Sequence, residues 1–269
     1  MSICSTETEA TADTVLIERD GPIVTVVLNR PEKLNAIDKA TWIALGDAIE
    51  VLEADDTVRC IVLRGAGDKA FSPGADISEF ETERADRDKA RSYNATVERT
   101  IGALEACRHP TLALIKGVCV GGGLEAAAFC DMRICGQSSK FGVPIKRLGL
   151  VMAYAELRGI VTLVGRAKTL EILLEGRIFG ADEALRMGLV NRIVADDKVE
   201  AECYATARRV AEGAPLTARF HKQALRRLVD PAPLSNEEIE AALDCYASED
   251  FHIGYRAFLD KISPEFKGR

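Results

Sequence analysis

The sequence predicts an α/β fold, in which strands alternate with helices along the chain and a helical region follows. Three observations predict it. The opening shows the order strand, strand, helix, strand; the central part shows strand, helix, strand; and from about Asp196 onward the pattern is helical and charged. With 269 residues, the chain is long enough for one large domain or for a domain with a helical extension.

Bulk composition restricts the classes of function that fit. Hydrophobic residues make up 47% of the chain and charged residues 29%, which is ordinary for a soluble globular protein. The formal net charge of −7 argues against nucleic-acid binding over a broad surface, because such binding needs basic side chains. No apolar run approaches the roughly 20 residues of a membrane-spanning helix, so we expect neither nucleic acid nor a membrane as a partner.

The first 14 residues, MSICSTETEATADT, are polar and acidic. They lack the apolar segment of a secretory signal and the arginines of a transit peptide. We therefore expect a disordered tail over residues 1–14 and a cytoplasmic protein.

The eight cysteines are scattered along the chain. Cys130 and Cys135 lie close together in sequence, but no histidine or further cysteine joins them at metal-ligand spacing. We expect buried, reduced thiols and no metal site.

The first elements follow from alternation and periodicity. Val15 to Asp20 and Ile23 to Asn29 are β-rich runs separated by Gly21-Pro22, which is a hairpin signal. Asp38 to Glu53 has apolar residues at helical spacing, among them Trp42, and this stripe predicts a core position for the indole ring.

A glycine-containing loop follows the next strand, Cys60 to Leu63. After a polar turn comes Ala70 to Phe80, AFSPGADISEF, in which Pro73-Gly74 marks a tight loop and Ala75-Asp76-Ile77 begins a short helix. This segment therefore leads from a strand through a tight loop into a helix.

A second glycine loop has the same organisation. The run from Leu112, LALIKGVCV, leads into Gly121-Gly122-Gly123 and a helix-forming run whose first turn contains Glu125. Glycine lets the backbone approach a ligand closely, although tight packing of a helix on a strand explains these glycines equally well. If the two loops converge, two backbone N–H donors can point at one oxygen atom and stabilise an oxyanion.

Five segments in this order carry a family signature: Leu28 to Ala36 (LNRPEKLNA), Phe71 to Ile77 (FSPGADI), Gly121 to Glu125 (GGGLE), Gly180 to Val190 (GADEALRMGLV) and Ala257 to Lys261 (AFLDK). Together they resemble the crotonase, or enoyl-CoA hydratase/isomerase, superfamily, and the resemblance covers nearly the whole chain. It implies a spiral of repeated strand-strand-helix turns over residues 15–195. It also implies a C-terminal helical region over residues 196–269 that packs on neighbouring subunits in a homotrimer or a dimer of trimers.

The resemblance implies an enzyme that acts on an acyl-CoA thioester, with coenzyme A as part of the substrate and no separate cofactor. The N–H groups of Ala75 and Gly122 would hold the thioester oxygen, and Glu125 would be the general acid/base. By position, the candidate substrate contacts are Lys33, Ala75, Asp76, Ile77, Gly121, Ile145, Tyr154, Glu156, Phe258 and Lys261. Phe258 and Lys261 match residues that reach the coenzyme A of the same or a neighbouring subunit, and helix packing or a solvated helix end explains them equally well.

The sequence departs from the family where a second carboxylate is expected. Phe141 to Leu150 resembles the segment that supplies it, but the position is Ile145, which can neither donate nor accept a proton. A few residues on, Met152 to Glu156, MAYAE, replaces the family's Pro-Gly-Ala-Gly-Gly. Tyr154 and Glu156 are the nearby polar candidates for the missing acid. The loop lysine that the family has after Ile77 is Ser78 here.

Hydratase-type addition of water to a 2-enoyl-CoA, a lyase reaction, is the function that these residues favour. The open alternatives are an isomerase or decarboxylase that uses a single carboxylate, and a non-catalytic pseudoenzyme that binds CoA esters. The fingerprints of dinucleotide-dependent oxidoreductases, serine hydrolases and phosphate-loop hydrolases are absent from the sequence.

Two further regions are charged and helical. Glu79 to Arg99 is crowded with charges, and we expect a solvated, mobile helical segment there that can act as a lid. The C-terminal helices are expected at Asp197 to Glu212, Leu216 to Leu228, Ser235 to Ala247 and Ser248 to Lys261.

Overall fold

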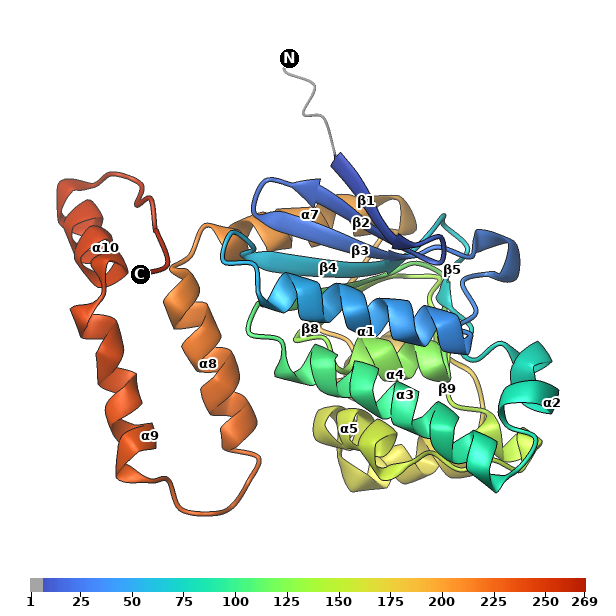
Figure 1. Ribbon diagram of the computed structural model, residues 1–269. Helices are drawn as coiled ribbons and strands as arrows, with labels where there is room; N and C mark the ends of the chain where they lie inside the picture. The colour runs from blue at the N-terminus through green and yellow to red at the C-terminus, as the bar shows by residue number, and fades with distance from the viewer. Residues whose placement is uncertain (1–6) are drawn as a thin grey trace.

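The computed structural model describes residues 7–269, which form two β-sheets, covering helices and a helical arm (Figure 1). The larger sheet has the strand order β1-β2-β3-β4-β6-β8-β11. Its first three strands are antiparallel, and the strands from β3 to β11 run parallel. Their bounds are β1 (Glu7–Ala12), β2 (Val15–Asp20), β3 (Ile23–Leu28), β4 (Cys60–Gly65), β6 (Thr111–Ile115), β8 (Met132–Gly136) and β11 (Arg192–Val194).

The smaller sheet has the order β10-β9-β7-β5. Its strands are β5 (Ala70–Ser72), β7 (Val118–Val120), β9 (Lys140–Gly142) and β10 (Phe179–Gly180). The chain fills both sheets in successive turns: β4 is followed by β5, β6 by β7, and β8 by β9, and each pair is followed by one or more helices. The expected spiral of strand-strand-helix turns is therefore confirmed.

Helices cover both faces of the larger sheet, because its strands alternate their side chains between two cores. In β4, Ile61 and Leu63 face the core under α1 and α3, whereas Cys60 and Val62 face the core under α7. The two sheets and the first seven helices form the body of the molecule. These helices are α1 (Lys39–Glu53), α2 (Phe80–Glu83), α3 (Arg87–Ala106), α4 (Gly122–Ala128), α5 (Tyr154–Glu175), α6 (Ala181–Arg186) and α7 (Val199–Ala211).

Local sequence explains where α1 begins. Asp38 caps the helix, since its Oδ1 atom accepts a hydrogen bond of 2.7 Å from the N–H of Thr41. Trp42 follows in the first turn and is almost completely buried, as its place on the apolar stripe predicted.

Three expectations about the chain's organisation are wrong. Residues 7–12 are not a disordered tail, because they form β1 and pair with β2, while residues 1–6 lie outside the described residues. The charged segment around α3 is not simply solvated, because α3 buries Tyr93 and Ile101 against the core. The body does not end at residue 195, because α7 packs on the larger sheet.

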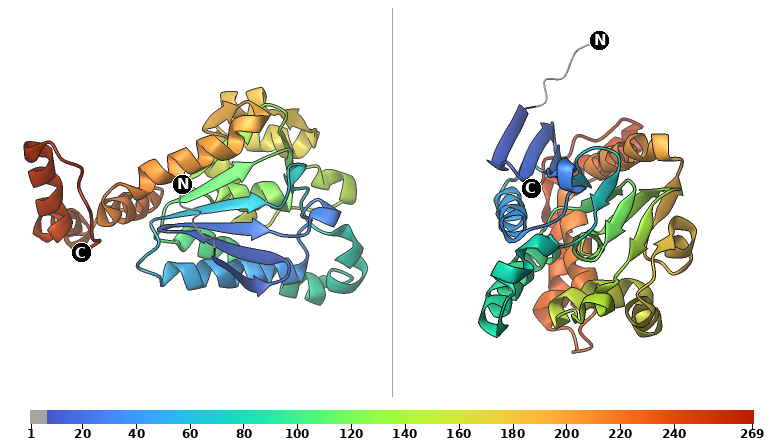
Figure 2. Two further views of the ribbon diagram at one scale, coloured as in Figure 1. Left: turned by 90° about the horizontal axis from the view of Figure 1, so that it is seen from above. Right: turned by 90° about the vertical axis from the view of Figure 1, so that its right-hand side faces the viewer.

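The last three helices, α8 (Pro215–Arg227), α9 (Asn236–Glu240) and α10 (Glu249–Asp260), form an arm that projects from the body in Figure 1 and in the left view of Figure 2. The 3₁₀ segment Ala241–Ala247 continues α9. All four predicted C-terminal helical segments are therefore present, with α7 belonging to the body and the other three to the arm.

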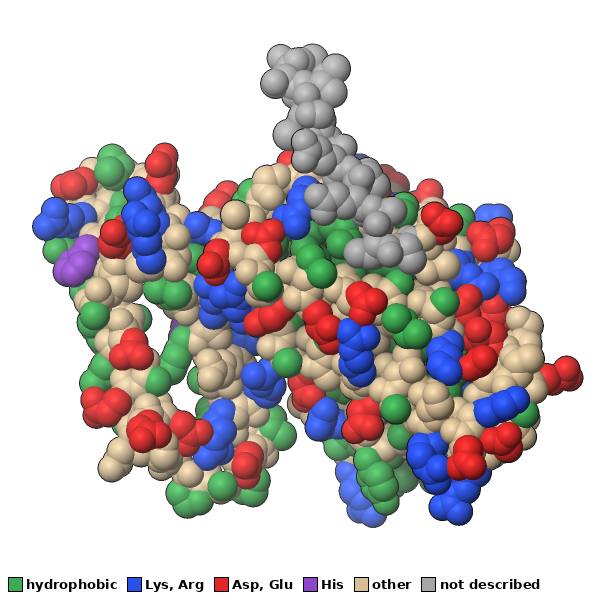
Figure 3. Space-filling view, viewed as in Figure 1, with side chains coloured by type: hydrophobic (Ala, Val, Ile, Leu, Met, Phe, Trp, Pro, Cys, Tyr) green, Lys and Arg blue, Asp and Glu red, His purple; other side chains and the backbone are tan. Residues whose placement is uncertain are grey.

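The surface in Figure 3 carries acidic and basic side chains interspersed, with no continuous basic patch on that face. In the described part of the chain, no helix is both long and apolar enough to cross a membrane. The cysteines from Cys60 to Cys245 are free thiols, and six of these seven are buried, as expected. Cys4 lies outside the described residues.

Candidate active site

The two glycine loops meet because the strands before them are neighbours. β5 and β7 run parallel in the smaller sheet, so the loops that follow them leave the same edge. A Cβ atom built on Gly122 would lie 3.6 Å from the backbone N of Ala75, and one built on Gly74 would lie 3.0 Å from the backbone N of Gly122. The loops are thus in direct contact, and a side chain at Gly74 would close the space between them.

The backbone N–H groups of Ala75 and Gly122 border this contact. Neither donates a hydrogen bond to another group within residues 7–269. The residue before each of them, however, is held by a backbone hydrogen bond. The N–H of Ile37 donates to the carbonyl of Gly74 at 2.8 Å, and the N–H of Gly121 donates to the carbonyl of Gly142 at 2.9 Å. Two available donors are therefore held side by side by a fixed backbone.

Helix α4 sits directly on β5. A Cβ atom on Gly123 would lie 2.5 Å from the carbonyl oxygen of Ser72, so only glycine permits this approach. All residues of α4 are buried. The N–H of Gly122 and the carboxyl group of Glu125, one turn further on, are consequently fixed to the same strand.

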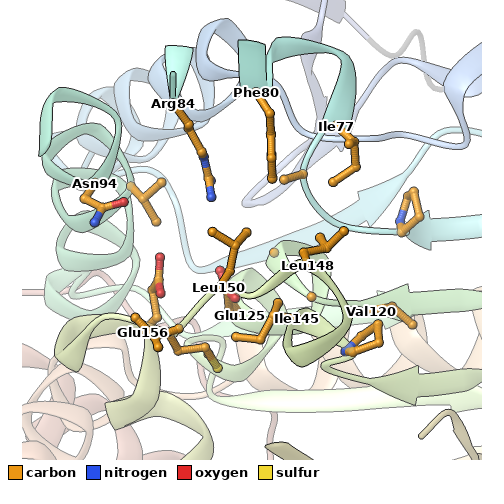
Figure 4. Close-up of a pocket in the computed structure, with 18 of the residues that line it drawn as sticks. Ile77, Phe80, Arg84, Asn94, Val120, Glu125, Ile145, Leu148, Leu150 and Glu156 are labelled. Carbon is orange, nitrogen blue, oxygen red and sulfur yellow. The ribbon is translucent and has the colours of Figure 1, made fainter. Parts of the chain in front are cut away.

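These loops form one end of a cavity of about 470 Å³ (Figure 4). Its walls are mostly apolar, with a few polar groups among them, which is the usual composition of a ligand site. The apolar lining includes Trp42, Pro73, Ile77, Phe80, Val97, Val120, Ile145, Leu148, Leu150, Val151 and Met152. The polar side chains are Arg84, Asn94, Glu125, Arg147 and Glu156.

Glu125 is a buried carboxyl group that opens on this cavity, with an exposed fraction of 7%. Burial first, and then the charge of Glu156, raise the pKa of Glu125 to about 8 against the opposing effect of Arg84. The start of a helix lowers the pKa of a carboxyl group, whereas an apolar pocket raises it. Burial is the stronger effect here.

Glu156 is a second carboxyl group in the same cavity. It lies in the first turn of α5, where its Oε2 atom accepts a hydrogen bond of 2.6 Å from the N–H of Ala153. Burial raises the pKa of Glu156 above its ordinary value, against the opposing effects of that hydrogen bond and of Arg84. The cavity thus contains two carboxyl groups although Ile145 stands at the position that resembles the family's second carboxylate.

The structure brings together seven of the predicted site residues. Ala75, Ile77, Gly121, Gly122, Glu125, Ile145 and Glu156 all line the cavity. The prediction for Tyr154 is wrong: its side chain is 93% exposed and does not line the cavity. Successive helical residues are about 100° apart, so Tyr154 and Glu156 lie on nearly opposite sides of α5.

Phe258 and Lys261 are remote from the cavity of their own chain. Both lie at the end of α10 in the arm, and the Phe258 side chain is 84% exposed. Figure 1 shows α10 at the opposite side of the molecule from α2, which borders the cavity. The structure does not bring these two residues to the cavity of their own chain, and their contact with coenzyme A stays a prediction.

Asp76 and Lys33 form a cluster beside the cavity. The Asp76 carboxylate accepts hydrogen bonds from Arg30 (2.9 Å), Lys33 (2.8 Å) and the Ser78 side chain (2.6 Å). The bonds from Lys33 and Ser78 hold the pKa of Asp76 well below its usual range. This carboxylate fixes the loop after β5 and does not line the cavity itself.

Replacing Asp76 with asparagine should lower the free energy of unfolding by about 2 kcal/mol near neutral pH, because the bonds are charge-assisted and Asp76 is largely buried. Since the folded pKa is depressed, this stabilisation is complete above the unfolded pKa of about 3.9 and is lost as the pH falls towards the folded value. Urea unfolding in neutral and acidic buffer measures both effects. Asp88→Asn, which removes an exposed ion pair, is the control and should change stability by less than about 0.5 kcal/mol. An equal loss in both variants contradicts the assignment.

Sequence reasoning missed Arg84 and Asn94, which lie in the segment interpreted as solvated. The guanidinium carbon of Arg84 lies 3.8 Å from the ring centre of Tyr93 and 4.8 Å from that of Phe80. Two aromatic residues within a run of charges were the available signal, because aromatic side chains in such a run indicate a buried face. Within the described residues, no group of three or more histidine, cysteine, aspartate or glutamate side chains could hold a metal ion.

A strand-strand-helix spiral whose glycine loops border a cavity with two carboxyl groups defines the class: an enzyme of the crotonase fold. The family model described as enoyl-CoA hydratase/isomerase matches residues 18–269. The chain belongs to the enoyl-CoA hydratase/isomerase family and is an enzyme of that family, whose hydratases are lyases.

Individual relatives agree with this assignment. A short-chain-enoyl-CoA hydratase from Clostridium acetobutylicum is 32% identical over 95% of this chain and 98% of its own. A crotonyl-CoA hydratase from Syntrophomonas wolfei is 30% identical over 94% and 98%. The crystal structure of an enoyl-CoA hydratase/carnitine racemase from Magnetospirillum magneticum is 45% identical, covers 97% of both chains and superposes with a TM-score of 0.95.

Proposed function

We propose that the protein adds water across the double bond of a 2-enoyl-CoA thioester. The observation that carries the proposal is the pair of carboxyl groups, the buried Glu125 and the half-buried Glu156, in one cavity with two available backbone N–H donors. Coenzyme A is part of the substrate, and the reaction needs no separate cofactor. Hydratase relatives from two bacteria support the reaction class.

The N–H groups of Ala75 and Gly122 receive the thioester oxygen. When water attacks the β carbon, the electron pair of the double bond moves towards the carbonyl and negative charge develops on its oxygen. Fixed donors stabilise this enolate more than the neutral substrate, and each contributes on the order of 3 kcal/mol in the transition state. This arrangement therefore lowers the barrier to addition.

The two carboxyl groups divide the proton transfers between them. Because they interact, they titrate as a pair, and the pair holds one proton over a range of pH. The ionised group takes a proton from the attacking water while the neutral group gives its proton to the α carbon. One proton enters the pair and one leaves it, so the two carboxyl groups together hold one proton again at the end of the reaction.

Electrostatics favours the resting proton on Glu125. Its pKa of about 8 results first from burial and then from the charge of Glu156, whereas Glu156 is stabilised as an anion by the Ala153 N–H group and by Arg84. Glu156 thus supplies from α5 the second carboxyl group that Ile145 cannot supply. An isomerase or decarboxylase with a single carboxylate has no use for this second group, which favours hydration.

Product analysis tests the proposal against its alternatives. Crotonyl-CoA and longer 2-enoyl-CoAs should lose their conjugated absorbance and gain the mass of one water. A 3-enoyl-CoA that is converted without a mass change indicates an isomerase, and loss of carbon dioxide from an alkylmalonyl-CoA indicates a decarboxylase. Calorimetric binding of these esters with no conversion indicates a pseudoenzyme, and any of these three results in place of hydration contradicts the proposal.

Glu156→Gln should reduce the kcat for hydration by about 100-fold, because one of two proton-transfer groups is lost while its shape is kept. It should also lower the pKa of Glu125, since the charge of Glu156 helps to raise it. The fall of kcat/KM on the alkaline side, expected near pH 8 in the wild type, should therefore shift to lower pH. Glu175→Gln, an exposed residue at the end of the same helix, is the matched control. An unchanged pH profile in Glu156→Gln contradicts the shared role.

We also propose that the arm mediates a homotrimer or a dimer of trimers. Its helices expose large apolar side chains, among them Leu225, Leu228, Ile239 and Leu243, and burial of such groups drives association. Light scattering measures the mass in solution, and a monomer at micromolar concentration contradicts this part of the proposal.

A further inference from the structure

The cavity contains a cation, Arg84, that touches neither of the two carboxyl groups in an ion pair. Arg84 follows α2, and within residues 7–269 it forms no ion pair. Its Nε atom is buried and has no hydrogen-bond partner in that part of the chain. An unpaired, partly buried cation is unfavourable, so the cavity contains a positive charge that lacks a direct anionic partner.

Aromatic rings hold this guanidinium in place. The ring of Tyr93, which is buried in the core, lies 3.8 Å from its central carbon, and the ring of Phe80 lies 4.8 Å away. Such stacking uses the flat face of the group. The N–H donors along its edge remain available for an acceptor with two oxygen atoms, which a carboxylate matches.

The place of Arg84 within the cavity indicates which part of the ligand it meets. In Figure 4, Arg84, Asn94 and Glu156 lie on one side of Glu125, whereas Ile77 and Val120 lie on the other. The N–H donors of Ala75 and Gly122 belong to the two loops that contain Ile77 and Val120. An acyl chain whose thioester oxygen meets those donors therefore extends its far end past Glu125 towards Arg84.

The two carboxyl groups of the cavity share one negative charge in the proposed mechanism, and neither forms an ion pair with Arg84 within residues 7–269. Burial raises the pKa of both Glu125 and Glu156 and outweighs the opposing effect of Arg84 on each. The rest of the cavity lining is mostly apolar and includes Val97, Leu150 and Met152. A straight hydrocarbon chain would leave the cation without a partner.

We propose that Arg84 binds a carboxylate at the far end of the acyl chain, so that the substrates are CoA half-esters of unsaturated dicarboxylic acids. This inference rests on the proposed function and specifies its substrate class. A site built to pair a polar group discriminates strongly against an analogue that lacks the group, because its own buried donors are then unpaired.

Binding of matched saturated esters tests the inference without requiring turnover. Succinyl-, glutaryl- and adipyl-CoA are compared by calorimetry with butanoyl-, pentanoyl- and hexanoyl-CoA, which have the same chain lengths and end in a methyl group. The wild type should bind at least one dicarboxylic ester about tenfold more tightly than its partner. Arg84→Met should raise the dissociation constant of that dicarboxylic ester by about 10- to 100-fold. The dissociation constant of the methyl-ended ester should stay within about threefold of the wild-type value.

Two further variants make the comparison specific. Arg87→Met removes an exposed cation three residues away and should keep the wild-type preference. Arg84→Lys retains the charge without the two-pronged geometry and should retain part of the preference. Because each preference is a ratio within one variant, a partly unfolded sample does not change it.

The outcomes separate this inference from the proposed function. Equal or tighter binding of the methyl-ended esters at all three lengths overturns the inference, as does a preference that survives in Arg84→Met. If the dicarboxylic esters are preferred but their 2-enoyl counterparts are not hydrated, the substrate class stands and the proposed reaction fails. If no CoA ester of either kind binds, both fail.

Discussion

Replacing Glu125 with glutamine will reduce the kcat for hydration of a 2-enoyl-CoA by roughly 10³- to 10⁴-fold. Glutamine has nearly the same shape as glutamate but can neither take a proton from water nor give one to the α carbon at neutral pH. The amide should still fit against the walls of the cavity, so the dissociation constant for a saturated acyl-CoA should remain within about threefold. Single-turnover kinetics and calorimetric binding measure the two quantities separately.

The same variant should be more stable than the wild type in alkaline buffer. Glu125 has a folded pKa of about 8, against about 4.3 in an unfolded chain. Between these values the folded state binds a proton that the unfolded state releases, so the wild type loses stability as the pH rises. Glutamine does not titrate, and the stability difference should therefore grow from acidic pH to about pH 8 and then level off.

Two results contradict this account of Glu125. Hydration at more than a tenth of the wild-type rate would mean that another group moves the proton. A stability difference that does not change with pH would mean that the carboxyl group is not protonated by burial. Urea unfolding across the same pH range supplies the second measurement.

Gly122→Pro should reduce kcat by about 10³-fold, because proline removes the N–H group that is proposed to hold the thioester oxygen. Gly122 is the first residue of α4, and proline is well tolerated at this helical position. Gly121 before it has φ 52° and ψ −126°, outside the right-handed helical region that proline disfavours in its predecessor. The fold should therefore persist, which circular dichroism and thermal unfolding check.

Gly122→Ala is the matched control, because it adds a Cβ atom but keeps the N–H group. The Cβ atom would lie 3.2 Å from the Trp42 ring, so a small shift of the ring is required. We expect a loss of activity of less than about tenfold and a stability cost of about 1 kcal/mol. If proline and alanine reduce kcat equally, the effect is steric and the Gly122 N–H group is not an essential donor.

Much of the fold could be predicted from the sequence because its signals are local. The hairpin at Gly21-Pro22, the apolar stripe around Trp42 and the strand Cys60–Leu63 all appear where they were expected. The errors concern pairing between distant segments. Residues 7–12 are polar and acidic, and they form a strand because β2 offers them an edge. Likewise, α7 belongs to the body because its apolar side chains pack against one face of the larger sheet, and this contact between distant segments cannot be read from the helix's own sequence.

The site was predictable to the extent that it depends on the backbone. The two glycine loops indicated Ala75, Gly122 and Glu125, and the structure places all three at one cavity. Side-chain direction was not predictable in the same way. Tyr154 and Glu156 were equal candidates in sequence, and only the start of α5 at Tyr154 decides that Glu156 points inward. Arg84 was missed because its partners are aromatic faces rather than opposite charges.

The seating of α4 on the Ser72 carbonyl has a consequence for how this protein can be altered. Because no side chain fits at Gly123, any change there shifts the helix, the N–H group of Gly122 and Glu125 at once. The opposite wall, residues 144–156, bears on the cavity from a separate segment. Redesign for another acyl group or another reaction should therefore begin in that wall. A side chain that transfers protons can be moved between positions there without displacing α4, the N–H group of Gly122 or Glu125.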